Sequence, residues 1–85
     1  MKLDLLSPNT AIECIVWSKL DVMLYIQDYT FILSYGSYTN PNAYYVEVVH
    51  NYISTEIKEF DSIKDVMRFI RNTAPDENIE MEVLS

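Results

Sequence analysis

Two residues could take part in nucleophilic or acid–base catalysis: the only cysteine, Cys14, and the only histidine, His50. A catalytic pair must lie within hydrogen-bond reach, and a third group usually orients the base. A single cysteine on a predicted strand is ordinarily a small buried hydrophobic residue, and a single histidine at a strand end is ordinarily solvated. We therefore expect a protein that is not an enzyme, and keep a small enzyme using Cys14 or His50 as an alternative.

Acidic residues gather near the carboxyl end of the sequence, where hard cations would find several carboxylate oxygens. Their spacing is not that of an EF-hand loop, and glutamates on the outer face of a strand commonly protect an edge against unwanted pairing. One cysteine cannot build a thiolate zinc site. The only glycine, Gly36, excludes glycine-rich phosphate loops. We therefore expect no metal and no cofactor.

The tyrosines are concentrated in one part of the chain. Six of the seven lie between residues 29 and 55, where Glu47 is the only acidic or basic residue apart from His50. Tyrosine combines a broad apolar surface with a polar tip and is enriched at protein interfaces. We expect a partner-binding surface that includes Tyr38 in a loop and whichever of Tyr44 and Tyr45 points outward. The aromatic residues predicted to bind a partner are Trp17, Tyr35, Tyr38, Tyr44, Tyr45 and Tyr52.

These residues must be positioned by strands and one helix. Runs of β-branched and aromatic residues predict strands, two of them joined by a tight turn near Asp28. Gly36–Asn42 is the clearest loop, and 51–54 is predicted to be a bulge or a turn. The predicted strands are Ile12–Trp17, Val22–Gln27, Thr30–Tyr35, Ala43–His50, Thr55–Phe60 and Ile79–Val83.

A helix is predicted over about 62–72. Ser62 can cap it by accepting a hydrogen bond from the backbone N–H of Asp65. The apolar stripe of this helix consists of Ile63, Val66, Met67 and Ile70, with Phe69 on its flank.

Residues 1–85 are long enough for a single small domain. The order of elements predicts an α+β fold: a mostly antiparallel sheet of five or six strands, one helix on one face, and a C-terminal strand after it. Several predicted strands are apolar on both faces, and one helix can cover only one of them. We therefore expect the second face to meet another molecule.

Thirteen acidic and six basic residues give a net charge of −7, which disfavours direct nucleic-acid binding and favours a protein partner with a basic surface. In size and acidity only, the chain resembles small phage-encoded inhibitors, some of which imitate DNA by their charge. A homodimer joined through the uncovered sheet face, without independent activity, is the structural alternative. The acidic residues assigned to the partner surface are Asp61, Asp65, Asp76, Glu77, Glu80 and Glu82.

The N-terminal sequence lacks the apolar core of a signal peptide, because Asp4 and Pro8 interrupt it. A single cysteine excludes an internal disulfide. We expect a cytoplasmic protein, without a membrane span.

Overall fold

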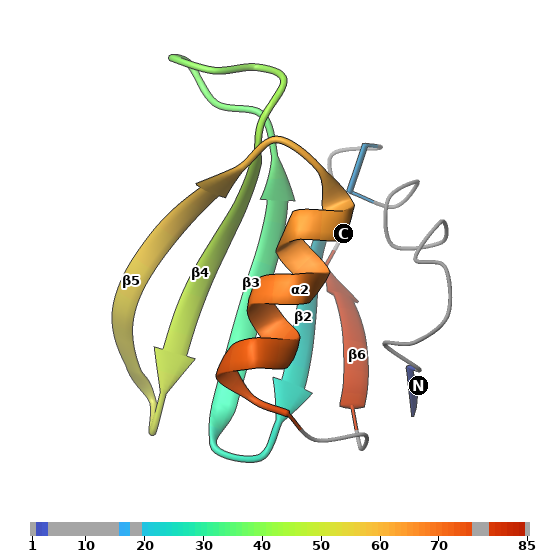
Figure 1. Ribbon diagram of the computed structural model, residues 1–85, viewed down its shortest axis with the longest axis vertical. Coiled ribbons are helices and arrows are strands. Elements are labelled where there is room, and N and C mark those ends of the chain that lie inside the picture. Colours follow the sequence, from blue (N-terminus) through green and yellow to red (C-terminus); the bar gives the residue numbers. More distant parts are fainter. Residues whose placement is uncertain (1, 4–15, 18–19, 76–78, 85) are drawn as a thin grey trace.

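The computed structural model describes residues 2–3, 16–17, 20–75 and 79–84, which form an α+β fold (Figure 1). The strands make one antiparallel sheet in the order β1-β6-β2-β3-β4-β5. Helix α2 follows β5, and β6 follows the helix, as predicted. The elements are β1 (Lys2–Leu3), β2 (Asp21–Ile26), β3 (Tyr29–Tyr35), β4 (Tyr44–His50), β5 (Ile53–Phe60), α2 (Ile63–Thr73) and β6 (Ile79–Leu84).

The core lies between α2 and one face of the sheet. Strand residues alternate between faces, so in β2 the buried Val22, Leu24 and Ile26 point to the core and the residues between them point away. In β3 and β4 the same period buries Phe31 and Val46. The buried core residues are Val16, Val22, Leu24, Ile26, Phe31, Leu33, Tyr44, Val46, Val48, Val66, Met67, Ile70, Ala74 and Ile79.

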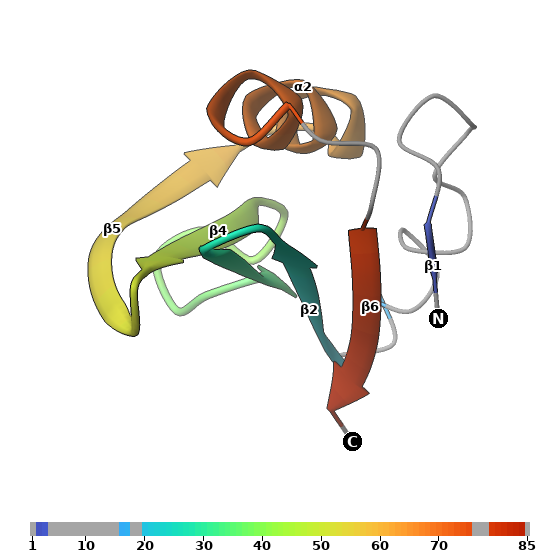
Figure 2. The ribbon, with the colours of Figure 1, turned by 90° about the horizontal axis from the view of Figure 1, so that it is seen from below.

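Helix α2 begins and packs as its sequence predicts. The Ser62 side chain accepts a hydrogen bond from the backbone N–H of Asp65 at 3.2 Å, which confirms the cap. Val66, Met67 and Ile70 of the stripe are buried, and Ile63 packs against the core. Figure 2 shows the helix lying over one side of the sheet.

The opposite side of the sheet, the outer face, is not covered by any helix in the described part of the chain (Figure 2). Along β2 and β4 this face carries Met23, Tyr25, Tyr45, Glu47 and Val49, which are all half-buried. It is therefore neither a second core nor a purely polar surface.

The predicted strand Ile12–Trp17 is wrong at its end, because Val16 and Trp17 have helical backbone conformation. Residues 12–15 lie outside the described residues. Strand propensity is a weak guide, and packing against neighbouring elements overrides it. The ends of β2 to β6 agree with the predicted strands or differ from them by one residue, except that β5 begins two residues earlier, at Ile53. No strand was predicted at β1. A two-residue turn, Asn51–Tyr52, joins β4 to β5, and the register shifts between Val48 and Val49.

Candidate protein-interaction surface

The aromatic residues predicted to bind a partner do not form one surface. Tyr38 is fully exposed in the loop between β3 and β4, and Tyr52 is fully exposed in the turn between β4 and β5, at the other end of the sheet (Figure 1). Trp17 is 56% exposed, whereas Tyr44 is 5% exposed and belongs to the core. Tyr45 on the outer face is therefore the outward member of the Tyr44–Tyr45 pair.

The loop that carries Tyr38 has a defined conformation. Gly36 has a φ of 86°, in the left-handed region that favours glycine, and its N–H donates to the carbonyl of Ala43 at 2.8 Å. Inside the loop, the Ser37 N–H donates to the Asn40 carbonyl at 3.0 Å. These two bonds close the loop at its base and again near Tyr38.

Side chains tie this loop to the outer face. The Tyr45 hydroxyl donates to Glu59 Oε2 at 3.0 Å, and Asn40 Nδ2 donates to Glu59 Oε1 at 3.1 Å. The Ser37 and Tyr45 hydroxyls lie 2.7 Å apart, and because the Tyr45 proton points to the carboxylate, Ser37 is the donor between them. A charged acceptor strengthens such bonds. Glu59 thus holds both the loop and the tyrosine.

The sequence does not predict that Ser37, Asn40 or Glu59 contributes to this surface. Tyr45 and Glu59 are direct cross-strand partners of β4 and β5. Knowing the register of that hairpin would have revealed their contact. The register depends on the irregularity between Val48 and Val49, which no residue pattern in the sequence marks.

A second aromatic cluster lies beside the loop. The indole N–H of Trp17 donates to the Tyr44 hydroxyl at 2.6 Å, and the Trp17 and Tyr35 ring centroids are 6.0 Å apart. Tyr35 in turn lines a shallow hollow together with Gly36, Ser37, Tyr38 and Pro41. We use the name tyrosine-loop surface for Trp17, Tyr35, Ser37, Tyr38 and Pro41. Buried Tyr44 orients Trp17 within it.

The opposite end of the sheet holds His50. Its ring stacks on Tyr29 with centroids 4.3 Å apart, and the neighbouring Asn51 N–H donates to the Asp28 carbonyl at 3.2 Å. These contacts join the β2–β3 and β4–β5 turns. Cys14, the other residue of the predicted alternative of a small enzyme, lies outside the described residues.

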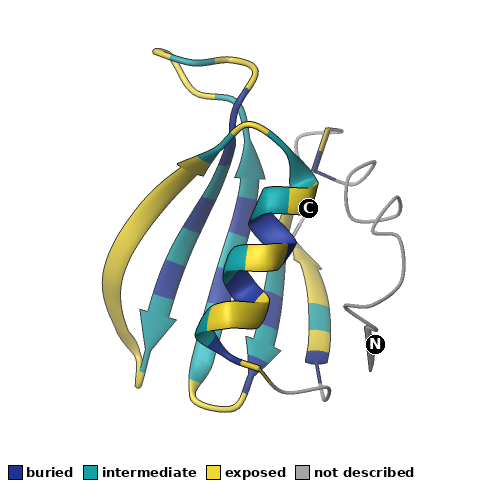
Figure 3. Ribbon diagram, in the orientation of Figure 1, coloured by how far each residue is buried: buried dark blue, intermediate teal, exposed yellow. Residues whose placement is uncertain are grey.

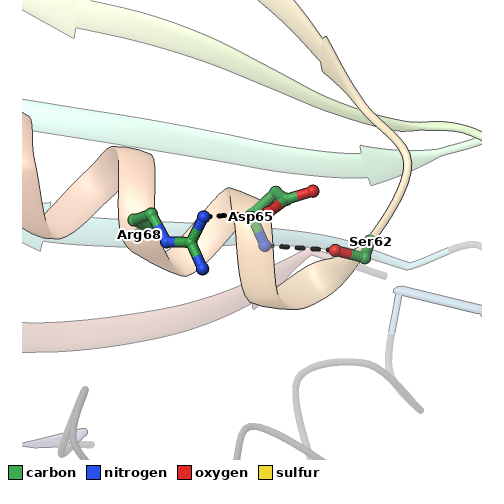
Figure 4. A network of polar contacts seen from close by, with 3 residues as sticks. All are labelled: Ser62, Asp65 and Arg68. Atoms are coloured by element: carbon green, nitrogen blue, oxygen red, sulfur yellow. Dashed lines mark hydrogen bonds and ion pairs between the residues drawn. The ribbon is translucent and has the colours of Figure 1, made fainter.

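The acidic residues predicted to contact a partner are also dispersed. Asp61 and Asp65 stand at the start of α2, where Asp65 pairs with Arg68 at 3.5 Å (Figure 4). Glu80 and Glu82 are exposed on β6 and lie opposite Tyr25 and Met23, so they belong to the outer face. Asp76 and Glu77 lie outside the described residues.

A further hollow lies between β5 and α2. Phe60 and Phe69 pack with centroids 5.3 Å apart, and Lys58 Nζ lies 5.4 Å from the centre of the Phe69 ring. Such contact stabilises a cation next to an aromatic face. The hollow is lined by Glu59, Phe60, Asp61, Asp65, Arg68, Phe69 and Asn72.

Within the described residues, no three histidine, cysteine or acidic side chains gather closely enough to hold a metal ion. No helix in the described part of the chain is both long and apolar enough to cross a membrane.

Comparisons of this chain with family models, with curated proteins and with solved structures each returned no match.

Proposed function

We propose that this protein is a non-enzymatic interaction module that binds another protein through the tyrosine-loop surface. The observation that supports this most directly is Tyr38, a fully exposed aromatic side chain on a loop that hydrogen bonds hold to the outer face, from Asn40 to Glu59 and from Ser37 to Tyr45. An exposed tyrosine on a loop of defined shape loses little conformational freedom when it binds.

The composition of the loop suits this role. Gly36–Asn42 reads Gly-Ser-Tyr-Thr-Asn-Pro-Asn. Recognition loops of antibodies are enriched in Tyr, Ser, Gly and Asn, because tyrosine supplies rigid contact area and the small polar residues supply adaptable hydrogen bonds. Trp17 and Tyr35 extend the apolar area beside Tyr38. Aromatic anchors of this kind contribute most of the energy in many protein interfaces.

The charge of the chain indicates the class of partner. A net charge of −7 attracts basic surfaces over long distances and repels acidic ones. Since Asp61 and Asp65 lie at the helix start and Glu80 and Glu82 on the outer face, the charge acts as a general field around the molecule. We propose that it steers a basic protein toward the tyrosine-loop surface. A small inhibitor that occupies a basic host protein is the specific form of this proposal.

The test compares two tyrosines of equal exposure. Three immobilised proteins are incubated with lysate of the producing organism: the unaltered chain, the Tyr38→Ala variant and the Tyr52→Ala variant. The proteins that each one retains are identified by mass spectrometry. We expect the unaltered chain and the Tyr52→Ala variant to retain the same protein. The Tyr38→Ala variant should retain about one tenth of that amount or less, as expected for an interface hot spot. Tyr52 is the matched control because it is equally exposed at the opposite end of the sheet.

Purified partner then tests the electrostatic component. Affinity should fall as sodium chloride rises from about 50 to about 500 mM, because salt screens charges that lie farther apart than the Debye length. An affinity that does not change over this range of salt concentration would contradict the proposed electrostatic steering. Equal retention by Tyr38→Ala would contradict the assignment of the loop.

A further inference from the structure

Strand β5 is exposed along nearly its whole length. It stands at the end of the strand order and pairs only with β4 among the described strands. Every residue from Ile53 to Glu59 is exposed, and Figure 3 shows the strand exposed along nearly its whole length. Ile53 and Ile57 are each 67% exposed. A long edge strand with exposed apolar residues is a template for pairing with another strand.

The sequence of β5 is self-complementary about Ile57. Two copies related by a two-fold axis would pair antiparallel, with each side chain remaining on its own face of the sheet. An axis at Ile57 places Ile57 opposite its own copy. Glu56 of each chain then lies opposite Lys58 of the other, so two pairs of opposite charge form. Opposite charges and apolar pairs directly across two strands are stabilising.

The neighbouring registers lack this complementarity. An axis at Glu56, Lys58 or Glu59 places that charged residue directly opposite its own copy, and like charges directly opposite are destabilising. Because side chains alternate faces, an axis between two residues would bring opposite faces together. Glu56 and Lys58 share the helix face, since they pair with the buried Val48 and Val46. Ile57 pairs with Glu47 and so lies on the outer face.

We propose that two copies of this chain associate through β5 in the register centred on Ile57. The partner is a second copy of this chain, because the segment Glu56–Ile57–Lys58 is complementary to its own reverse: opposite charges face each other and the apolar Ile57 faces its own copy. The pairing continues the sheet from one copy to the next and covers Ile57 on the outer face. It leaves the tyrosine-loop surface unused and is independent of the function proposed for it.

Charge reversal tests the register. The full chain has a mass of 10.0 kDa, so sedimentation equilibrium at micromolar concentration should give about twice this value. Glu56→Lys places lysines opposite lysines, and Lys58→Glu places glutamates opposite glutamates. Each single variant should raise the dissociation constant of the dimer about tenfold or more. The double variant, with Glu56→Lys and Lys58→Glu, restores both opposite-charge pairs and should dimerise again.

An equimolar mixture of the two single variants adds a further requirement. Lysines of one chain then face glutamates of the other, so the mixture should dimerise although each variant alone does not. Glu82→Lys, an equally large charge change on exposed β6, is the control and should remain dimeric. Far-ultraviolet circular dichroism shows that each variant is folded. An unaltered chain that remains at 10.0 kDa, or a dimer that withstands both single reversals, would overturn the proposal.

Discussion

Tyr52 has a φ of 68° and follows Asn51, whose φ is 52°. Two consecutive residues with positive φ are typical of the tight type I′ turns that join antiparallel strands, in which Asn-Gly is the preferred sequence. Asparagine tolerates this conformation, but a tyrosine there carries backbone strain. Its side chain is fully exposed and makes no packing contribution that offsets the strain. The turn is therefore a site where the sequence is not optimal for stability.

Tyr52→Gly should raise the free energy of unfolding by about 0.5–1 kcal/mol, because glycine adopts positive φ without steric cost. Urea denaturation followed by Trp17 fluorescence or circular dichroism measures this change. Tyr38→Gly is the control: Tyr38 is equally exposed but does not have a positive φ, so glycine there should give no gain. A loss of stability in Tyr52→Gly would show that the tyrosine side chain stabilises the turn.

Helix α2 illustrates how local sequence and packing cooperate. Its Ser62 cap satisfies a backbone N–H that the helix itself leaves without an acceptor (Figure 4). Arg71 lies in the last turn, where a positive charge favours the negative end of the helix dipole. The buried stripe, including Ile70, then packs the helix onto β4 and β5 and the rest of the sheet. An isolated helix of 11 residues would be marginal without that packing.

Ser62→Ala should lower the free energy of unfolding by about 1 kcal/mol, since the Asp65 N–H loses its acceptor. Thermal and urea unfolding would measure the loss. Ser62→Asp is the matched variant, because aspartate keeps an acceptor and adds a negative charge at the positive end of the helix dipole. Its stability should stay within a few tenths of a kcal/mol of the unaltered chain. Equal losses in both variants would rule out the cap as the cause.

The whole molecule carries many more acidic than basic groups on a small surface. At a net charge of −7, unscreened repulsion among exposed carboxylates opposes the compact state. Glu80 and Glu82 share the outer face with half-buried Glu47. The same field that would steer a basic partner therefore has a cost in the stability of the unbound chain.

Raising sodium chloride from about 10 to about 200 mM should stabilise the unbound protein, because the shortened Debye length screens this repulsion. Urea denaturation measures the effect without adding a second salt. A variant with Glu80→Gln and Glu82→Gln should gain less from salt, since it carries two fewer negative charges. If the urea concentration at the unfolding midpoint falls as salt rises, attractive ion pairs such as Asp65 with Arg68 outweigh the repulsion.

The elements of this protein are largely determined by local sequence. Runs of strand-forming residues predict β2 to β6, and Gly36 with Pro41 predicts the loop. Ser62 and the apolar stripe predict α2 to within one residue at each end. All of these signals act over a few neighbouring residues. The strand predicted at Ile12–Trp17 is wrong at Val16 and Trp17, because propensity alone does not decide a short apolar segment.

The tertiary structure decided which side chains meet. It buried Tyr44 and left Tyr45 on the outer face, it joined Glu59 to the Tyr38 loop, and it separated the acidic residues. It also placed β5 at the edge of the sheet. Each outcome depends on strand order and register, which arise from contacts between residues far apart in the chain. Local patterns cannot specify those contacts, because a shift of one residue moves every side chain of a strand to the other face.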